Sequence, residues 1–315
     1  MNSARLSGLI REFLSDDVLT LLRDPKIDEV YINPDLLVRT ITSSGKRVAT
    51  SIRLSPQNAE AFLRTIASIT STQFDRHHPS LATAISQKDL GKCRIQGFIP
   101  PLTLGPAFNI RKPCRQIPTL QEYVTRSVMS SCEFSILVNA IESRQNILIA
   151  GPTGSGKTTL CNAVLKMIVD TFSDERMVIL EDTSELAVQA TDTLQLITTP
   201  EIGMTELLKF SLRVTPNRII VGEVRDRSAK DLLDAWITGH PGGCATIHGE
   251  DVDKALQRLN DLAREGASGI DQRHLVLQAV HIVIVIVGYG NTRRIHQIAR
   301  VTGLSSTGFK IASML

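Results

Sequence analysis

Apolar positions in the first part of the chain follow a helical spacing and then a strand-like one. Residues 6–22 place apolar side chains three or four positions apart, which predicts an amphipathic helix. Residues 29–53 carry short β-rich runs around Asn-Pro and Ser-Ser-Gly-Lys turns, which predict a small sheet. Ser55 and Pro56 then provide an N-cap and a first-turn proline for a helix that ends near residue 69.

Two more strand-like runs, residues 93–99 and 107–111, complete this pattern. Residues 1–112 therefore predict a small α+β domain. Two prolines and alternating basic residues follow, a composition that ends both helices and strands, so we expect an interdomain linker within residues 113–130. The same segment begins the next helix, because Thr119 and the glutamate three residues later match a capping box.

The second part of the chain, residues 131–315, alternates apolar strands with helical stretches. Strands this apolar are buried on both faces, as in a mainly parallel sheet covered by helices. A Gly-Tyr-Gly-Asn turn before RRIHQIARV predicts a closing hairpin. This part therefore predicts an α/β domain. Its strand segments read NILIAG, MVILED, LQLITT, RIIVGEV, CATIH and HIVIVIV, beginning at residues 146, 177, 194, 218, 244 and 281.

Composition agrees with a folded two-domain protein and excludes several classes. The chain has 315 residues, 42% hydrophobic and 21% charged, which is long enough for two cores and far from the composition of disordered chains. Its 35 basic and 32 acidic residues leave a charge of +3, too balanced for a histone-like protein. The five cysteines lack metal-ligand spacing and predict reduced, cytosolic thiols. The most apolar run, residues 279–287, is too short to cross a membrane, and we expect no integral span.

One glycine-rich segment matches a complete phosphate-binding motif. Gly-Pro-Thr-Gly-Ser-Gly-Lys-Thr, between a predicted strand and a predicted helix, fits G-x-x-x-x-G-K-[ST]. The glycines let the backbone curl so that amide N–H groups face phosphates, and the helix N-terminus adds positive potential. Lys157 is expected to bridge the β- and γ-phosphates of a nucleotide, and the Thr158 hydroxyl to bind Mg²⁺. The predicted nucleotide-binding residues are Gly151, Pro152, Thr153, Gly154, Ser155, Gly156, Lys157, Thr158 and Thr159.

Acidic residues follow two of the apolar strands. Ligands of parallel α/β sheets bind at the carboxyl ends of strands, so Glu181, Asp182 and Glu223 are expected near the phosphates. Either acid of the first pair is placed to orient Mg²⁺ or the attacking water, although acids also cap helices at strand exits. Asp182 is the second metal candidate after Thr158. Glu223 is the preferred catalytic carboxylate, because an acid in this position polarises water. Glu185 is interpreted as a solvated first-turn residue.

A further segment, TGHPGGCATIH at residues 238–248, joins a helix to a strand and ends on His248. A single histidine at a strand end is more often a hydrogen-bonded polar group than a catalyst, so its value depends on its neighbours.

Together these segments resemble the motifs of the type II/type IV secretion ATPases. The P-loop, EDTSEL, RIIVGEVRD and TGHPGG-ATIH look like that family's Walker A, Asp box, Walker B and His box, in the same order. Within the family, the chain is most similar to conjugal-transfer and type IV secretion traffic ATPases. Residues 24–34, 94–101 and 108–112 look like the family's N-terminal domain. The resemblance implies a RecA-like P-loop NTPase domain preceded by the smaller α+β domain.

The resemblance also implies a function and further site residues. It implies a cytoplasmic, ATP-hydrolysing motor that forms a hexameric ring, docks peripherally on inner-membrane secretion-complex proteins and couples Mg²⁺-ATP hydrolysis to domain motion. By motif match, Glu181 and Glu223 are candidate catalytic acids, and His248 senses the γ-phosphate. Arg94 and Arg111 match arginines that reach the nucleotide phosphates in this family; taken alone, each would be a solvated surface charge.

Two alternatives share parts of this pattern. A RecA-like DNA helicase or translocase has the same P-loop, but the near-neutral charge and the 4% of aromatic residues argue against a strand-tracking groove with stacking platforms. A nucleotide switch without hydrolysis is the non-enzymatic alternative. No N-K-x-D guanine-reading motif is present, and Glu223 with His248 suits turnover better.

Overall fold

The chain consists of two compact units, Met1–Arg115 and Gln116–Leu315. Each unit has its own sheet and its own buried apolar core. The predicted linker, residues 113–130, includes residues 114–116, which lie outside the described residues. The structure is a computed structural model that describes residues 5–87, 90–113, 117–188, 190–199, 201–306 and 308–314.

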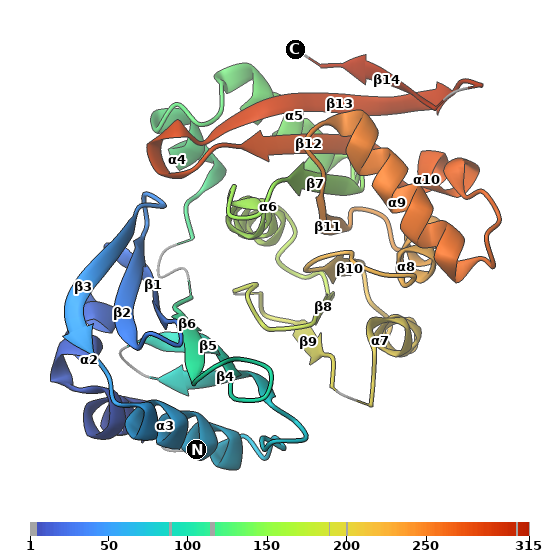
Figure 1. The fold of residues 1–315 in the computed structure, drawn as a ribbon. Coiled ribbons are helices and arrows are strands. Elements are labelled where there is room, and N and C mark those ends of the chain that lie inside the picture. Colours follow the sequence, from blue (N-terminus) through green and yellow to red (C-terminus); the bar gives the residue numbers. More distant parts are fainter. Residues whose placement is uncertain are drawn as a thin grey trace. The chain divides into compact units, whose positions relative to one another are not determined.

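A six-stranded antiparallel sheet forms the framework of the first unit (Figure 1). Its strand order is β3-β2-β1-β6-β5-β4. Side chains of the sheet and helices, such as Val30, Phe62 and Ile66, pack into one apolar core. The strands are β1 (Ile27–Ile32), β2 (Leu37–Thr42), β3 (Arg47–Arg53), β4 (Ser80–Gln87), β5 (Gly91–Phe98) and β6 (Ala107–Arg111). The helices are α1 (Arg5–Leu9), the π-helical turn η1 (Ile10–Leu14), α2 (Asp16–Arg23) and α3 (Pro56–Ile69).

The predicted N-terminal helix is wrong in one respect, because it is broken at Ser15. Ser15 has a φ angle of 109°, and its hydroxyl accepts a hydrogen bond from the backbone N–H of Val18, which caps α2. Apolar spacing does not detect the break, since Leu14 and Val18 on either side of it face the same core. Strand β4 was not predicted either, because its sequence SLATAISQ is rich in small and polar residues, as an edge strand allows.

The second unit is built on an eight-stranded sheet of order β14-β13-β12-β7-β11-β10-β8-β9. The six strands from β12 to β9 run parallel, and β13 and β14 add antiparallel neighbours at one edge. All six predicted apolar strands are present, as is the closing hairpin; β14 was not predicted. The strands are β7 (Ile147–Gly151), β8 (Met177–Glu181), β9 (Thr193–Ile197), β10 (Arg218–Val221), β11 (Cys244–His248), β12 (Ile282–Val287), β13 (Arg294–Leu304) and β14 (Phe309–Ser313).

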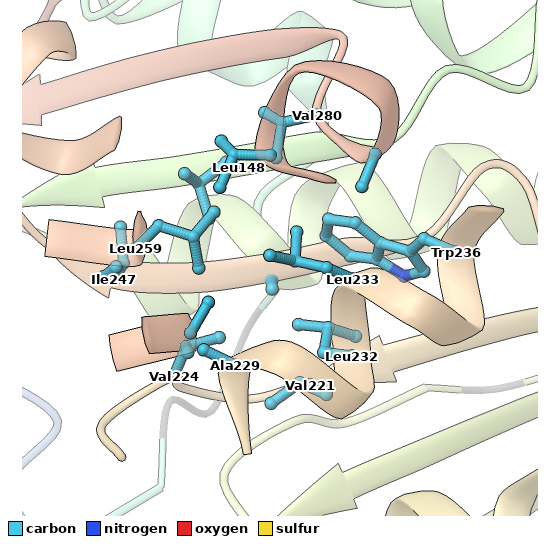
Figure 2. Packing of buried hydrophobic residues seen from close by; sticks show 14 of the residues in the cluster. Leu148, Val221, Val224, Ala229, Leu232, Leu233, Trp236, Ile247, Leu259 and Val280 are labelled. Atoms are coloured by element: carbon cyan, nitrogen blue, oxygen red, sulfur yellow. The ribbon is translucent and has the colours of Figure 1, made fainter. Parts of the chain in front are cut away.

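Helices cover both faces of this sheet, which explains its continuous apolar strands. Along β7, Leu148 and Ala150 join one core and Ile147 and Ile149 the other. Figure 2 shows the first core, where Leu148 lies among side chains of the covering helices. The chain is thus an α/β protein. The helices of the second core are α4 (Leu120–Thr125), α5 (Ser131–Glu142) and α6 (Lys157–Thr171); those of the first are α7 (Met204–Ser211), α8 (Ala229–Ile237), α9 (Val252–Gly266) and α10 (Arg273–Ala279). The predicted capping box at Thr119 and Glu122 begins α4.

A buried ion pair ties together the amino ends of the parallel strands. Arg218, the first residue of β10, is fully buried, and its guanidinium donates to Glu175 and to the carbonyl of Gly242, the latter at 2.9 Å. The guanidinium also lies 4.6 Å from the centroid of the Phe172 ring. Arg144 pairs with the other oxygen of Glu175 but is 40% exposed. Two arginines therefore balance the charge of Glu175, and Arg218 is the buried one of the two.

We expect Arg218→Ala to lower the free energy of unfolding of the second unit by about 3–5 kcal/mol, because it leaves the Glu175 carboxylate buried without its inner partner. The matched control Arg144→Ala removes the exposed pair and should cost about 1 kcal/mol or less. Chemical denaturation of both variants measures the difference. Equal losses in the two variants would contradict this account of the network.

Candidate active site

The glycine-rich segment forms a tight curl between β7 and the 15-residue helix α6. Gly154 and Gly156 have φ angles of 78° and 99°, a left-handed backbone that glycine adopts without steric cost. Gly156 is also the N-cap of α6, so the N–H groups of the first helical turn have no partner within the helix. A curl followed by a free helix N-terminus is an arrangement that binds anions.

Lys157, the first residue of α6, folds its side chain back over the curl. Its ammonium donates to the carbonyls of Gly151 and Pro152 at 2.9 and 3.1 Å, and the residue is only 8% exposed. Burial lowers the pKa of Lys157, and the nearby carboxylate of Glu223 opposes that shift. The lysine is therefore a mostly buried cation whose hydrogen bonds end on loop carbonyls, which are weaker partners for a cation than an anion.

The two strands beside β7 bring a histidine and an acid to this ammonium. β11 lies next to β7, and β10 lies next to β11, so their carboxyl ends share one edge of the sheet. Nδ1 of His248, the last residue of β11, is 3.5 Å from Nζ of Lys157. Nε2 of the same imidazole is 2.6 Å from Oε1 of Glu223. His248 therefore connects the P-loop lysine to the carboxylate that follows β10.

The environment of His248 favours its neutral form. Burial lowers its pKa first, and the charge of Lys157 lowers it further, whereas Glu223 raises it. The net shift is downward from an ordinary value near 6.5, so the imidazole is uncharged at pH 7. A neutral imidazole has one donor and one acceptor nitrogen, which lets it hydrogen-bond to two different neighbours.

Arg225, which the sequence analysis did not single out, contacts both Glu223 and Asp182. Its guanidinium pairs with Oε2 of Glu223, and its Nη1 lies 3.7 Å from Oδ2 of Asp182. The hydrogen bond to Glu223 raises the pKa of Arg225. The signal available in the sequence was its place in the RIIVGEVRD segment, two residues after Glu223.

Glu181, the last residue of β8, is buried and uses both carboxylate oxygens within the protein. Oε1 accepts from the backbone N–H groups of Glu185 and Leu186, both at 2.8 Å, and Oε2 accepts from Nε2 of Gln195 at 2.5 Å. Burial raises the pKa of Glu181, and these hydrogen bonds oppose the shift. The carboxylate therefore fixes the backbone of residues 182–186. A side chain at Gly222 would crowd it, because a Cβ there would lie 2.9 Å from Cγ of Glu181.

One oxygen contact lies at the first turn of α6, and a second lies at the end of β8. The hydroxyl of Thr158 donates to Glu185 at 3.4 Å, and Asp182 accepts from Thr198 at 3.3 Å. Glu185 lies in a loop, so its interpretation as a first-turn helical residue was wrong. Within the described ranges, no group of three or more His, Cys, Asp or Glu side chains could hold a metal by itself. Hydroxyl and carboxylate oxygens do suit Mg²⁺, which commonly takes one or two protein ligands and completes its shell with water and phosphate.

Arg94 and Arg111 lie in the first unit. They are register partners on the neighbouring strands β5 and β6, and Nε of Arg111 is 3.5 Å from Oε1 of Glu29. The two arginines therefore occupy paired positions on neighbouring antiparallel strands. Their expected contact with nucleotide phosphates stays a prediction.

Comparison with known protein families shows to which family this chain belongs. The family described as "Type II/IV secretion system protein" matches residues 85–289, a range that holds the P-loop, Glu223 and His248. The chain belongs to this family. Among the described residues, no helix combines the length and apolar character needed to cross a membrane.

Three similar proteins each match most of the chain. The conjugal transfer protein TrbB of Rhizobium radiobacter is 36% identical over 308 residues, covering 97% of this chain and 93% of the relative. The type IV secretion system protein VirB11 of Bartonella henselae is 28% identical, covering 85% of this chain and 86% of the relative. The crystal structure of the pilus retraction motor PilT with bound ADP has a TM-score of 0.62 at 17% identity, covering 94% of this chain and 81% of that one. The last likeness shows a shared fold.

We expect Lys157→Ala to raise the pKa of His248, because the substitution removes a neighbouring positive charge that disfavours imidazolium. Glu223→Gln should lower it, since the carboxylate favours imidazolium. An NMR titration of the imidazole resonances measures both shifts, with Lys166→Ala on the same helix as a control. Shifts of the opposite sign, or none, would show that the three side chains do not meet in solution.

Proposed function

We propose that this chain is the ATP-hydrolysing motor of a conjugative transfer or type IV secretion apparatus. The observation that carries the proposal is the meeting of Lys157, His248 and Glu223 at the carboxyl ends of β7, β11 and β10. An anion-binding curl beside a carboxylate and a neutral imidazole suits in-line transfer of a phosphoryl group to water. Membership of the secretion family and the similarity to TrbB and VirB11 support the biological setting.

We further propose a RecA-like P-loop NTPase domain at residues 131–315, preceded by an α+β domain at residues 1–112 and a linker within 113–130. The parallel core strands and the strand-curl-helix unit around α6 support the first assignment. The antiparallel sheet with its covering helices supports the second.

Phosphate binding is assigned to the P-loop, Gly151 to Thr159. In this proposal Lys157 exchanges the carbonyls of Gly151 and Pro152 for oxygens of the β- and γ-phosphates, which offer negative charge as well as hydrogen-bond acceptors. The N–H groups of the curl and of the α6 N-terminus hold the remaining phosphate oxygens. Thr158 would hold Mg²⁺, with Asp182 as a second candidate, and the ion would supply positive charge that offsets the charge of the phosphates.

Catalysis is assigned chiefly to Glu223. Its carboxylate accepts a proton from the attacking water as the water oxygen bonds to the γ-phosphorus and the bond to the β,γ-bridging oxygen breaks, which releases ADP. Arg225 keeps the acid in place through its pairing. Neutral His248 lies between Lys157 and Glu223, and its single N–H would exchange the Glu223 carboxylate for a γ-phosphate oxygen, which lets the residue sense whether that phosphate is present.

Glu181 is assigned a positioning role. Both of its oxygens already accept hydrogen bonds, so its carboxylate acts through the loop that carries Asp182 and Glu185. The family resemblance implies two candidate catalytic acids, and this proposal assigns catalysis to Glu223 and positioning to Glu181.

The remaining parts of the proposal concern assembly and location. We infer a homo-oligomer, with a hexameric ring as the expected form, that is cytoplasmic and peripheral to inner-membrane secretion-complex proteins. Arg94 and Arg111 are proposed to reach the phosphates and to couple the ATP state to domain motion, because a cation placed there stabilises developing charge. The helicase alternative would gain support from salt-sensitive affinity for DNA.

We expect Glu223→Gln to reduce kcat for ATP hydrolysis by about 10²- to 10⁴-fold while the dissociation constant for ATP changes little, because the substitution removes the proton acceptor and leaves the P-loop intact. Steady-state phosphate release and equilibrium binding measure the two quantities. The control Glu250→Gln alters an exposed acid paired with Lys254 and should behave like the wild type.

Normal turnover by Glu223→Gln would contradict this assignment of the catalytic acid. Wild-type protein that binds ATP without hydrolysing it would favour the nucleotide switch instead.

A further inference from the structure

A loop on the other side of the P-loop packs against it and takes no part in the phosphate chemistry above. Residues 288–293 connect β12 to β13, and β12 neighbours β7 on the side away from β11. The hydroxyl of Tyr289 donates to the carbonyl of Thr153 at 2.9 Å. The ring also lies against Gly154, where a Cβ would come within 2.9 Å of Cε1. The tyrosine itself stays 52% exposed.

Arg293, at the end of the same loop, lies over the N-cap of α6. A Cβ at Gly156 would fall 2.7 Å from its Nε and 2.9 Å from its Cζ. The Nε atom is buried and has no hydrogen-bond partner among the described residues. A buried donor without an acceptor costs free energy, which an acceptor on a ligand would recover.

The direction of the bound nucleotide follows from the sheet order. In the proposed ATP site the γ-phosphate is assigned to His248 and Glu223, which lie on the β11 side of Lys157. We place the phosphate chain along the curl from there, so the nucleoside lies on the opposite side of Lys157, toward β12. The first side chains on that side are those that touch Thr153, Gly154 and Gly156.

We propose that Tyr289 and Arg293 form the nucleoside subsite, in which they contact the sugar and base of the bound nucleotide. This inference rests on the proposed ATP site and names the part of ATP that these residues bind. Both side chains offer planar surfaces on which a base or a sugar packs, and the guanidinium adds donors for sugar and base acceptors. Stacking of this kind needs no base-reading motif.

The experiment compares two ligands that differ by the nucleoside. Calorimetric titrations with a non-hydrolysable ATP analogue and with inorganic tripolyphosphate, both with Mg²⁺, give two dissociation constants for each variant. We expect Arg293→Ala to weaken the analogue on the order of tenfold, the loss of one good stacking contact, and tripolyphosphate by a smaller factor, so that the preference for the analogue falls. Arg294→Ala, at the exposed first position of β13, is the matched control and should change neither.

A second pair of variants separates the ring of Tyr289 from its hydroxyl. Tyr289→Phe keeps the ring and loses the hydrogen bond to Thr153, so it should retain the preference for the analogue over tripolyphosphate. Tyr289→Leu removes the ring and should reduce that preference. Unchanged tripolyphosphate binding also shows that a variant is folded.

Two results would overturn the inference. Parallel loss of both ligands in Arg293→Ala and Tyr289→Leu would mean that the loop only braces the P-loop, and an unchanged preference would mean that the nucleoside lies elsewhere. In either case wild-type binding would leave the proposed ATP site standing. Wild-type protein that binds neither ligand would overturn the proposed function itself.

Discussion

The candidate site of the second unit is arranged around the ammonium of Lys157. This ammonium is mostly buried, it carries a charge that burial disfavours, and its hydrogen bonds end on the carbonyls of Gly151 and Pro152. A cation in this position is stabilised best by an anion, and the curl and the α6 N-terminus offer N–H groups to the same anion. The two-sided apolar core around β7 holds the curl in place, since both faces of that strand are packed.

The order of the parallel strands then determines which side chains lie near the Lys157 ammonium. Because β11 and β10 follow β7 in the sheet, their carboxyl ends deliver His248 and Glu223 to one side of the ammonium. β12, on the other side, delivers the loop that ends at Arg293. In the proposed ATP site the sheet separates a reacting side from a nucleoside side, and Arg225 and Glu181 contact the loops of the side assigned to the reaction.

Much of this arrangement could be read from the sequence because it rests on local patterns. The glycine-rich motif and the all-apolar strands each carry a short-range signal, and the predicted strand and helix that flank the motif are present, as are the apolar strands. Features set by tertiary contacts were missed. Arg225 and Glu185 gain their importance from partners on other elements, the break at Ser15 leaves the apolar spacing unchanged, and β4 and β14 are edge strands with weak apolar patterns.

The central claim is that assembled copies of this chain hydrolyse ATP. Steady-state hydrolysis across a range of protein concentrations, with the oligomer mass determined on the same samples, tests it most directly. The account predicts that activity per chain rises as the larger species forms. Activity that is the same for the monomer, or absent at every concentration, would contradict it.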